Sequence, residues 1–517
     1  MAILLGAVIV AGSALPAQAA PEPLREFHQQ QPEWKPCAFH AAAECADIAV
    51  PMDYARPGAE RISIALSRIR ASDPARRRGV LLSNPGGPGG EGLELPKAFA
   101  GTPLAKAYDL IGFDPRGVGR STELSCEDTV PDPKVRSRPT DAEMTVLVDH
   151  ARAVEAACAK AGGELRKHVN TANTARDMDV IRAVLGEKKI NYLGFSYGTY
   201  LGAVYGSLFP AAVDRSVLDS AVHPDWVWRD QFKQQAIATK QSVQAWAEWV
   251  GERNESFGLG RSAAEVIAVV ERISARLAVK PIDGMTQTFF DRILAALRFR
   301  GGWQEFAEII KGISEAVEQP ARSADAVRAL RLLHAAGITP TRQGVFDAVL
   351  CEADWPTDVS TYLDDMRTFR EKYPYGGGIV AAAPFPCTFR SFTPKEQPVR
   401  LQRKGYQAGL VVQAEADAQT HYDGGPALAE RLSHHLVSVA DEGEHGLYLF
   451  NPCVTRHVDR YLLDGVLPPS RSVCAGQPRP EVPEDGAGVN TRFAPTKSLE
   501  AAARKLIAEG KVGHKPF

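Results

Sequence analysis

The chain has 517 residues, of which 44% are hydrophobic and 24% charged, and its 60 lysines and arginines against 62 acidic residues give a net charge of −2. This composition is typical of an ordinary globular protein, and it excludes a disordered, collagen-like or polytopic membrane chain. Because no basic excess is present, we expect neither nucleic acid nor a membrane surface as a partner.

The N-terminus has the features of a secretory signal peptide. Residues 1–15 carry no charge and are mostly apolar, and the small residues Ala17 and Ala19 that follow form a cleavage site. No basic residue precedes the apolar run, a gap that a start site further upstream would explain. The alternative is a buried N-terminal helix. We expect residues 1–19 to be removed and the mature protein to be secreted.

Secretion gives the even number of cysteines a meaning, because thiols persist as disulfides only in an oxidising compartment. The sequence alone does not fix the pairing, but the spacing of the cysteines favours local loops that join neighbours. The expected pairs are Cys37 with Cys45, Cys126 with Cys158, Cys351 with Cys387, and Cys453 with Cys474. The chain has no Cys-x-x-Cys motif and no histidines spaced for a helical zinc site, so we expect the cysteines to bind no metal.

Short apolar or β-branched runs, bounded by Gly, Pro and Asp, predict strands in the first half of the chain. They lie at residues 62–69, 80–83, 110–113, 190–195 and 216–218. A helix separates the later runs, because Met178, Ile181 and Leu185 recur at helical spacing and Gly186 ends the segment. Strands that alternate with helices indicate a mostly parallel sheet.

A long helical block follows these strands. Residues 226–354 show successive amphipathic helices and no strand pattern, with helices predicted at residues 226–250, 263–277, 288–297, 303–317, 324–335 and 342–350. Strand patterns return only at residues 410–413 and 436–439, and a last helix is predicted at residues 499–509. The block is therefore predicted to be an insertion into the sheet domain.

This pattern divides the chain into four parts. We expect a signal peptide at residues 1–19, the first part of an α/β core at residues 20–222, a helical cap at residues 223–394, and the second part of the core with a C-terminal segment at residues 395–517. A long insertion that leaves and rejoins a sheet usually covers something, so the cap is expected to lie over the functional site.

The strongest chemical motif is the sequence Gly-Phe-Ser-Tyr-Gly at residues 194–198. It follows a predicted strand and precedes a helix-like run at residues 199–208. In that context Gly-x-Ser-x-Gly predicts a nucleophile elbow, a tight turn that needs glycine on both sides of the serine while the hydroxyl projects. We therefore predict Ser196 as a nucleophile, with an ordinary turn serine as the alternative.

A nucleophilic serine needs a group that stabilises the developing negative charge and a base. The glycine-rich loop at residues 84–90 follows a strand and lacks the Gly-Lys-Ser/Thr ending of a phosphate-binding loop. In an α/β-hydrolase arrangement such a loop donates one oxyanion-hole N–H, and the residue after the nucleophile donates the other. Gly87 and Tyr197 are the predicted donors, with Gly86 as the alternative to Gly87.

The chain order of this arrangement places the acid after the nucleophile and the histidine last. Asp417 follows the predicted strand at residues 410–413, and His445 follows the one at residues 436–439. Both lie just past the carboxyl end of a strand, where they can reach the elbow. Asp219, read as a structural residue, is the chief rival acid, and Glu415 is a weaker one.

Several motifs, taken in order, are together specific. They are Asn-Pro-Gly-Gly-Pro-Gly at residues 84–89, Gly-Phe-Asp-Pro-Arg-Gly-Val-Gly-Arg-Ser at residues 112–121, and Gly-Phe-Ser-Tyr-Gly-Thr-Tyr-Leu-Gly at residues 194–202. With these motifs the chain resembles the secreted actinobacterial tripeptidyl aminopeptidases, which belong with the prolyl iminopeptidases among the α/β-hydrolase serine exopeptidases. The resemblance continues through Asp417 and Thr420 and through the segment from Cys453 to Cys474.

The resemblance implies an α/β-hydrolase fold with a helical cap, and Ser196, Asp417 and His445 as nucleophile, acid and base. The chain departs from the family pattern at Ala414 and Glu444, where Gly is usual, and the family's Pro after Thr420 is replaced by His421. The spacing of the motifs is kept.

The expected function is that of a secreted serine aminopeptidase of the tripeptidyl or prolyl type, which acts through an acyl-enzyme on peptides with a free N-terminus. No metal and no organic cofactor is expected, and the protein is expected to be a monomer. The alternative is a secreted carboxylic-ester hydrolase of the same fold.

An exopeptidase must also recognise the substrate ammonium group, and acidic side chains of a cap can bind it. Glu352 and Asp354 are the candidates, because they follow Cys351, whose predicted disulfide would hold the segment still. The alternative is a solvated acidic turn.

Overall fold

The structure is a computed structural model that describes residues 24–126, 130–282, 284–319, 324–336, 343–487, 495–496 and 498–509. The predicted signal peptide at residues 1–19 lies outside the described residues. Among the described residues, no helix is both long and apolar enough to cross a membrane.

One sheet of ten strands forms the centre of the described fold, in the spatial order β1-β2-β3-β5-β4-β6-β7-β8-β9-β10. Pairing is antiparallel from β1 to β5 and parallel from β5 onward through β10. The strands are β1 (Lys35–Pro36), β2 (Ala43–Pro51), β3 (Arg61–Ile69), β4 (Val80–Asn84), β5 (Asp109–Phe113), β6 (Ile190–Phe195), β7 (Val213–Asp219), β8 (Leu410–Ala414), β9 (His435–Ala440) and β10 (Arg471–Ala475).

The sequence predicted the strands from β3 to β9 and missed β1, β2 and β10. The central strands β4, β6 and β8 are buried along their whole length, so they read as continuous apolar runs. By contrast, β10 lies at the sheet edge with most of its residues exposed. It pairs with β9, and the disulfide between Cys474 and Cys453 ties it to the helix α17 (Pro452–Asp464).

Helices cover both faces of the sheet. On one face, residues such as Leu82 and Ile111 pack against Met178 of α5 (Thr171–Val184) and Leu201 of α6 (Tyr197–Leu208). On the other face, residues such as Leu81, Leu193 and Val412 pack with α17 (Pro452–Asp464). The remaining helices of the core are α1 (Arg25–His28), η2 (Pro74–Arg76), α2 (Pro96–Phe99), α3 (Leu104–Ala107), η3 (Leu165–His168), η4 (Pro210–Ala212) and α16 (Gly424–Leu432).

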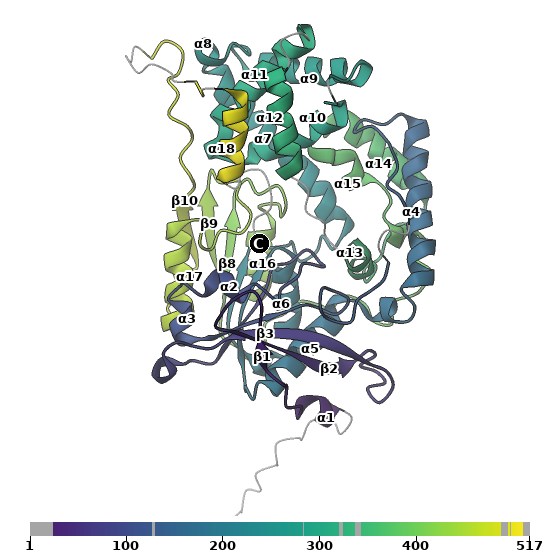
Figure 1. Cartoon of the computed structure of the whole chain (residues 1–517), viewed down its shortest axis with the longest axis vertical. Coiled ribbons are helices and arrows are strands. Elements are labelled where there is room, and N and C mark those ends of the chain that lie inside the picture. The colour runs from purple at the N-terminus through teal and green to yellow at the C-terminus, as the bar shows by residue number, and fades with distance from the viewer. Residues whose placement is uncertain are drawn as a thin grey trace, which may run out of the picture.

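A helical cap stands at one end of the sheet (Figure 1). Between β7 and β8 the described residues contain no strand, and the cap has an apolar core of its own that includes Trp246 and Trp303. Its helices are α7 (Arg229–Gly251), α8 (Asn254–Phe257), α9 (Ala263–Val279), α10 (Gln287–Ile293), η5 (Leu294–Arg298), η6 (Arg300–Gly302), α11 (Trp303–Glu318), α12 (Ala324–Ala336), α13 (Gln343–Leu350), α14 (Val359–Lys372), η8 (Tyr375–Gly377), α15 (Gly378–Ala382) and η9 (Pro386–Phe389).

Two helices pack against the cap, although the expected division of the chain assigns them to the core. The C-terminal helix α18 (Leu499–Ala508), expected with the core, contacts α11 and α12 and buries Leu506 in the apolar core of the cap. The helix α4 (Asp141–Ala161), expected with the first part of the core, packs Met144 and Val148 against cap residues such as Met366. The apolar faces of these helices pack against the cap, and Figure 1 shows both helices beside those of the cap. The domain boundaries themselves stay a prediction.

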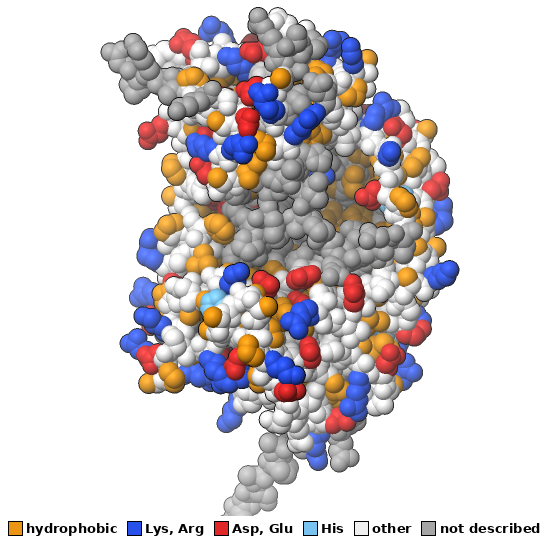
Figure 2. All heavy atoms as spheres, viewed as in Figure 1, with side chains coloured by type: hydrophobic (Ala, Val, Ile, Leu, Met, Phe, Trp, Pro, Cys, Tyr) orange, Lys and Arg blue, Asp and Glu red, His pale blue; other side chains and the backbone are white. Residues whose placement is uncertain are grey.

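The eight cysteines form four disulfides, which are the pairs expected from the sequence: Cys37–Cys45, Cys126–Cys158, Cys351–Cys387 and Cys453–Cys474. On the face drawn in Figure 2, basic and acidic side chains are interspersed, in keeping with the net charge of −2.

Candidate active site

Ser196 lies at a sharp turn between β6 and α6. Its backbone has φ 57° and ψ −128°, a conformation that costs a non-glycine residue about 1–3 kcal/mol and is found mainly at functional sites. The flanking glycines are required by space, because a Cβ on Gly194 would lie 2.6 Å from the ring of Tyr192 and one on Gly198 would lie 2.8 Å from the carbonyl oxygen of Asn84. Ser196 is partly exposed, and its N–H donates to the carbonyl of Asp219 at 3.0 Å. This is the geometry of a nucleophile elbow.

The glycine-rich loop after β4 lies directly beside this turn. A Cβ on Gly86 would lie 2.8 Å from the Cβ of Ser196 and 3.0 Å from the backbone nitrogen of Tyr197. The N–H of Gly86 already donates to Oδ1 of Asn84 at 2.9 Å. The N–H of Gly87 donates no hydrogen bond to any described residue. Of the two glycines, Gly87 therefore has the backbone N–H that is available to an oxyanion.

Asp417 and His445 meet just beyond the carboxyl ends of β8 and β9. Oδ2 of Asp417 lies 2.6 Å from Nδ1 of His445, and both side chains are buried. Asp417 also accepts hydrogen bonds from the N–H of Gln419 at 2.7 Å and from the N–H and hydroxyl of Thr420 at 3.1 and 2.9 Å. Burial acts to raise the pKa of Asp417, but the charge of His445 and these hydrogen bonds outweigh it and lower the pKa.

The two rival acids make other contacts. Asp219 is fully buried at the end of β7, and its Oδ2 accepts hydrogen bonds from the N–H groups of Leu447 and Tyr448 at 2.9 and 2.7 Å. Its neighbour Ser220 accepts a hydrogen bond from the N–H of Gly446 at 2.8 Å. Glu415 is exposed and accepts a hydrogen bond from the N–H of Asp441 at 2.9 Å. Asp219 thus holds the chain that follows His445, a role that its place at a strand end did not reveal.

The two predicted anchors for the substrate ammonium group lie in different surroundings. Asp354 is exposed, whereas Glu352 is buried and accepts hydrogen bonds from the N–H and hydroxyl of Thr171 at 2.7 and 2.8 Å. The Thr171 hydroxyl lies 2.9 Å from the hydroxyl of Tyr197, the residue after the predicted nucleophile. Burial raises the pKa of Glu352 to about 7, against the lowering effect of the two Thr171 hydrogen bonds.

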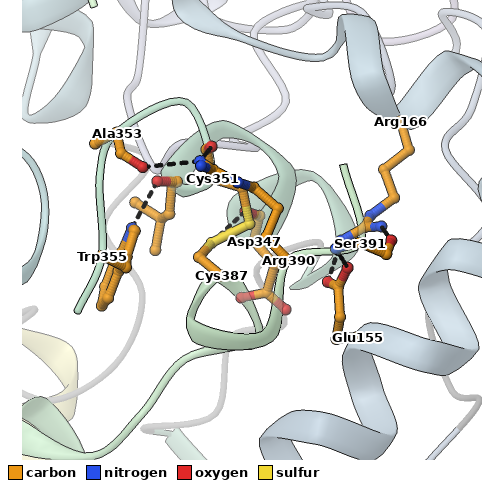
Figure 3. The surroundings of a disulfide bond; sticks show 10 residues. Glu155, Arg166, Asp347, Cys351, Ala353, Trp355, Cys387, Arg390 and Ser391 are labelled. Atoms are coloured by element: carbon orange, nitrogen blue, oxygen red, sulfur yellow. Dashed lines mark hydrogen bonds and ion pairs between the residues drawn. A yellow bond between two sulfur atoms is a disulfide. The ribbon is translucent and has the colours of Figure 1, made fainter. Parts of the chain in front are cut away.

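The segment that carries Glu352 is firmly held. The disulfide between Cys351 and Cys387 joins it to η9, and Arg390 donates hydrogen bonds to the carbonyls of Cys351 and Ala353 at 2.5 and 3.0 Å (Figure 3). Glu352 also lines a cavity of about 280 Å³, together with Tyr200 and Lys395. Only Glu352 of the two candidates is therefore linked to the nucleophile turn.

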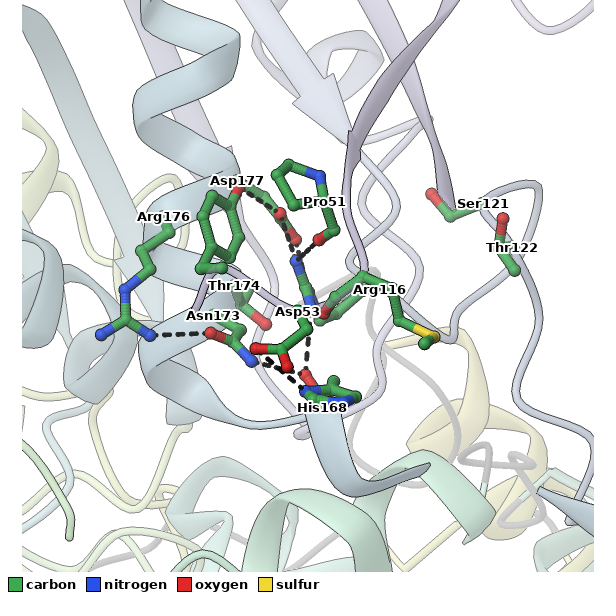
Figure 4. Close-up of polar contacts among 12 residues, drawn as sticks. Pro51, Asp53, Arg116, Ser121, Thr122, His168, Asn173, Thr174, Arg176 and Asp177 are labelled. Carbon is green, nitrogen blue, oxygen red and sulfur yellow. Dashed lines mark hydrogen bonds and ion pairs between the residues drawn. The ribbon is translucent and has the colours of Figure 1, made fainter. Parts of the chain in front are cut away.

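Thr171 is the first residue of α5, and other contacts hold the start of this helix in place. Arg116 is fully buried, pairs with Asp177 of α5 at 2.6 Å and donates to the carbonyl of His168 at 3.1 Å (Figure 4). Asn173 donates to the same carbonyl at 3.0 Å. The start of α5 is thus held by a buried ion pair on one side and by Glu352 on the other.

One group of potential metal ligands occurs in the described residues. It consists of Cys453, His457 and Cys474, but the two sulfur atoms are bonded to each other in a disulfide, so they offer no thiolate to a metal ion.

Comparison with known proteins shows the family of the chain. Residues 79–267 match the family model of the alpha/beta hydrolase fold, and residues 373–474 match that of TAP-like proteins. The chain is 37% identical over 478 residues to the tripeptidyl aminopeptidase of Streptomyces lividans, a match that covers 87% of this chain and 88% of the relative. The chain belongs to the tripeptidyl aminopeptidase family of α/β hydrolases.

More distant relatives carry other names. The serine protease Hip1 of Mycobacterium tuberculosis is 28% identical over 86% of this chain and 91% of its own length. A protein named carboxylesterase B, from the same species, is 29% identical over 91% of this chain and 95% of its own length. The similarity to these two relatives thus extends across the core and the cap.

Proposed function

We propose that this protein is a serine aminopeptidase that releases short peptides, foremost tripeptides, from the free N-terminus of its substrates. The observation that carries the proposal is the hydrogen bond between His445 and Asp417 in a chain whose Ser196 occupies a strained nucleophile elbow. The relatives named tripeptidyl aminopeptidase support the same activity.

The proposed reaction is acyl transfer. His445 accepts the proton of the Ser196 hydroxyl through Nε2, since Nδ1 faces Asp417. The serine oxygen attacks the peptide carbonyl, and the N–H groups of Gly87 and Tyr197 bind the oxyanion that forms. The imidazolium, stabilised by Asp417, then protonates the leaving amine. Water repeats the same steps on the acyl-enzyme and releases the N-terminal peptide.

Glu352 is the proposed anchor for the substrate ammonium group. Its side chain is buried, and its hydrogen bonds come from the neutral residue Thr171, so when Glu352 is ionised its charge is left to be balanced by a cation. Its link through Thr171 to Tyr197 supports a position beside the acyl part of the substrate. Asp354 is a weaker proposal, because its side chain is exposed.

The four disulfides are consistent with an extracellular protein. We propose that the protein is secreted through the signal peptide at residues 1–19, that its partners are peptides with a free N-terminus, and that it acts as a monomer without a metal or an organic cofactor.

The test is one panel of chromogenic substrates, run on the wild type and on Ser196→Ala. It compares tripeptidyl, alanyl and prolyl anilides, an acetylated tripeptidyl anilide and short-chain esters. We expect the free tripeptidyl anilide to be cleaved best and its acetylated form to lose at least tenfold in kcat/KM. Ser196→Ala should lose at least 1,000-fold, since removal of a catalytic serine can cost about 10⁶-fold in kcat.

A carboxylic-ester hydrolase is the second candidate, and the relative named carboxylesterase B favours it. Its chemistry needs the same nucleophile, acid, base and oxyanion donors. Fast cleavage of the esters, with every anilide left intact, would replace the aminopeptidase proposal by this one.

A further inference from the structure

Arg298 is a cap residue that lies against the loop of the predicted catalytic histidine. It is the last residue of η5. The carbonyl oxygen of Arg298 occupies the space that a Cβ on Gly443 would need, and the Cβ of Arg298 lies 3.0 Å from that position. Gly443 precedes His445 by two residues. Arg298 therefore borders the site on the side of the base.

The guanidinium of Arg298 has no partner among the described residues. It donates no hydrogen bond to them and forms no ion pair with them, although its Nε is buried. Its neighbour Arg300 differs, because it pairs with Asp441 at 3.2 Å. The side chain of Arg298 is partly exposed and lies over the ring of Phe299, with 4.4 Å from Cζ to the ring centroid. A buried donor such as this Nε is costly to leave without an acceptor, and a ligand can supply one.

Asp417 interacts electrostatically with Arg298 but forms no hydrogen bond or ion pair with it. Burial lowers the pKa of Arg298 and the charge of Asp417 acts to raise it, so the two groups interact. The oxygens of Asp417 are already used by His445, Gln419 and Thr420. The donors of Arg298 are thus left for another acceptor near the base.

We propose that Arg298 binds the C-terminal carboxylate of the leaving group, so that the preferred substrates are short peptides with both ends free. This inference rests on the proposed serine aminopeptidase function. In acyl transfer the base protonates the leaving amine, so the leaving group lies on the side of His445. Arginine presents a planar set of donors that matches a carboxylate. Glu352, linked to Tyr197 instead, would hold the opposite end of the peptide.

The test compares peptides that differ only in their C-terminal group. Each has the same N-terminal tripeptide and a leaving group of one, two or three residues, ending in either a free acid or an amide. For the wild type we expect the acid to exceed the amide in kcat/KM by about tenfold or more at one of these lengths, the size typical of one charged hydrogen bond. The difference is expected mainly in KM, because the carboxylate is remote from the reacting atoms.

Variants assign this preference to its residue. We expect Arg298→Gln to bring the acid-to-amide ratio near one, Arg298→Lys to keep part of it, and Arg272→Gln, which changes an exposed arginine on α9 of the same cap, to keep all of it. Each ratio is measured within a single enzyme, so it does not depend on the fraction of the variant that folds.

The tripeptidyl anilide carries no carboxylate, so its cleavage tests the aminopeptidase function separately from the role of Arg298. Cleavage of the anilide with equal rates for acid and amide peptides in the wild type would overturn the role of Arg298 and leave the aminopeptidase in place. An equal loss on acid, amide and anilide in Arg298→Gln would also overturn it, since Arg298 would then act through Asp417. No cleavage of the anilide or of any peptide would overturn the proposed function itself.

Discussion

Asp219 joins the end of β7 to the chain that follows His445. It accepts hydrogen bonds from the N–H groups of Leu447 and Tyr448, which belong to the backbone just after His445. Burial raises the pKa of Asp219 to about 6, against the lowering effect of these hydrogen bonds. At the scale of single residues, Asp219 holds the backbone that directly follows the histidine.

We expect Asp219→Asn to lower kcat by about 10- to 100-fold while KM changes little. The amide keeps one acceptor oxygen, but its NH2 group would face the N–H of Leu447 and the hydroxyl of Ser220, which both contact the other oxygen at 3.1 Å. Replacing an acceptor by a donor in a buried site costs about 1–3 kcal/mol. Steady-state kinetics on the tripeptidyl anilide and a thermal unfolding curve measure both effects. A fall in stability with kcat unchanged would show that Asp219 has no part in positioning His445.

Glu352 predicts a pH dependence of substrate binding. Its pKa of about 7 means that the carboxylate ionises as the pH rises from 6 to 7.5, while the α-amino group of a substrate stays largely protonated below about 7.7. KM for a free tripeptidyl anilide should therefore fall over this range, by up to about tenfold. The measurement is KM against pH for free and acetylated substrates.

Two variants assign this dependence. Glu352→Gln should make KM for the free substrate nearly independent of pH and close to that of the acetylated one. Asp354→Asn should keep the dependence of the wild type, because Asp354 is exposed and Thr171 donates its hydrogen bonds to Glu352. If the dependence disappears with Asp354→Asn and persists with Glu352→Gln, the anchor is Asp354.

At the scale of elements, the start of α5 is the joint between the core and the segment of Glu352. Arg116 holds it by pairing with Asp177 and by donating to carbonyls of Pro51, Met52 and His168. The side chains of Arg116 and Asp177 are both buried. Removing either partner would therefore leave the other as an unpaired buried charge, which lowers the stability of the fold.

We expect Arg116→Met to destabilise the protein by about 3–5 kcal/mol, because Asp177 is left as an unpaired buried charge. The double variant Arg116→Met with Asp177→Leu should recover part of the loss, since it removes that charge as well. Arg504→Met, which breaks an exposed pair with Glu500, is the matched control and should change little. Denaturant midpoints measure all three, and a double variant less stable than the single one would contradict the expectation.

At the scale of the whole molecule, the cap is built from more of the chain than the insertion. Ala502, Ala503 and Leu506 of α18 lie in its apolar core, and α4 adds a second cluster. The chain thus crosses from the core to the cap several times, which makes the stability of the cap depend on segments remote in sequence.

We expect Leu506→Ala to loosen the cap before the sheet. Removing a fully buried leucine costs about 2–5 kcal/mol, and the side chain of Leu506 packs within the apolar core of the cap. Hydrogen exchange should speed up in α11 more than in β6. Leu428→Ala, on α16 against the sheet, is the matched control and should show the reverse order. Equal acceleration in both elements by both variants would show that cap and core unfold as one unit.

Much of the site could be predicted from local pattern. Ser196, Asp417 and His445 each follow a strand that is recognisable by its apolar run, and the Gly-x-Ser-x-Gly motif contains its own steric requirement. The strands β2 and β10 could not be predicted from an apolar pattern. Polar residues interrupt the apolar residues of β2, which pairs with β3, and β10 is a mostly exposed strand at the edge of the sheet.

The sequence by itself determined the α/β-hydrolase core and the helical insertion, because both depend on spacing along the chain. The spacing of the cysteines favoured local pairs, and the structure established the four disulfides. Only the tertiary structure decided which of the candidate residues, distant in sequence, have the surroundings that their proposed roles require. It separated Glu352 from Asp354 by burial, left Gly87 rather than Gly86 with an available N–H, and brought Arg298 against the loop of His445. Burial, hydrogen-bond partners and nearby charge are properties of neighbours in space, and no local pattern records them.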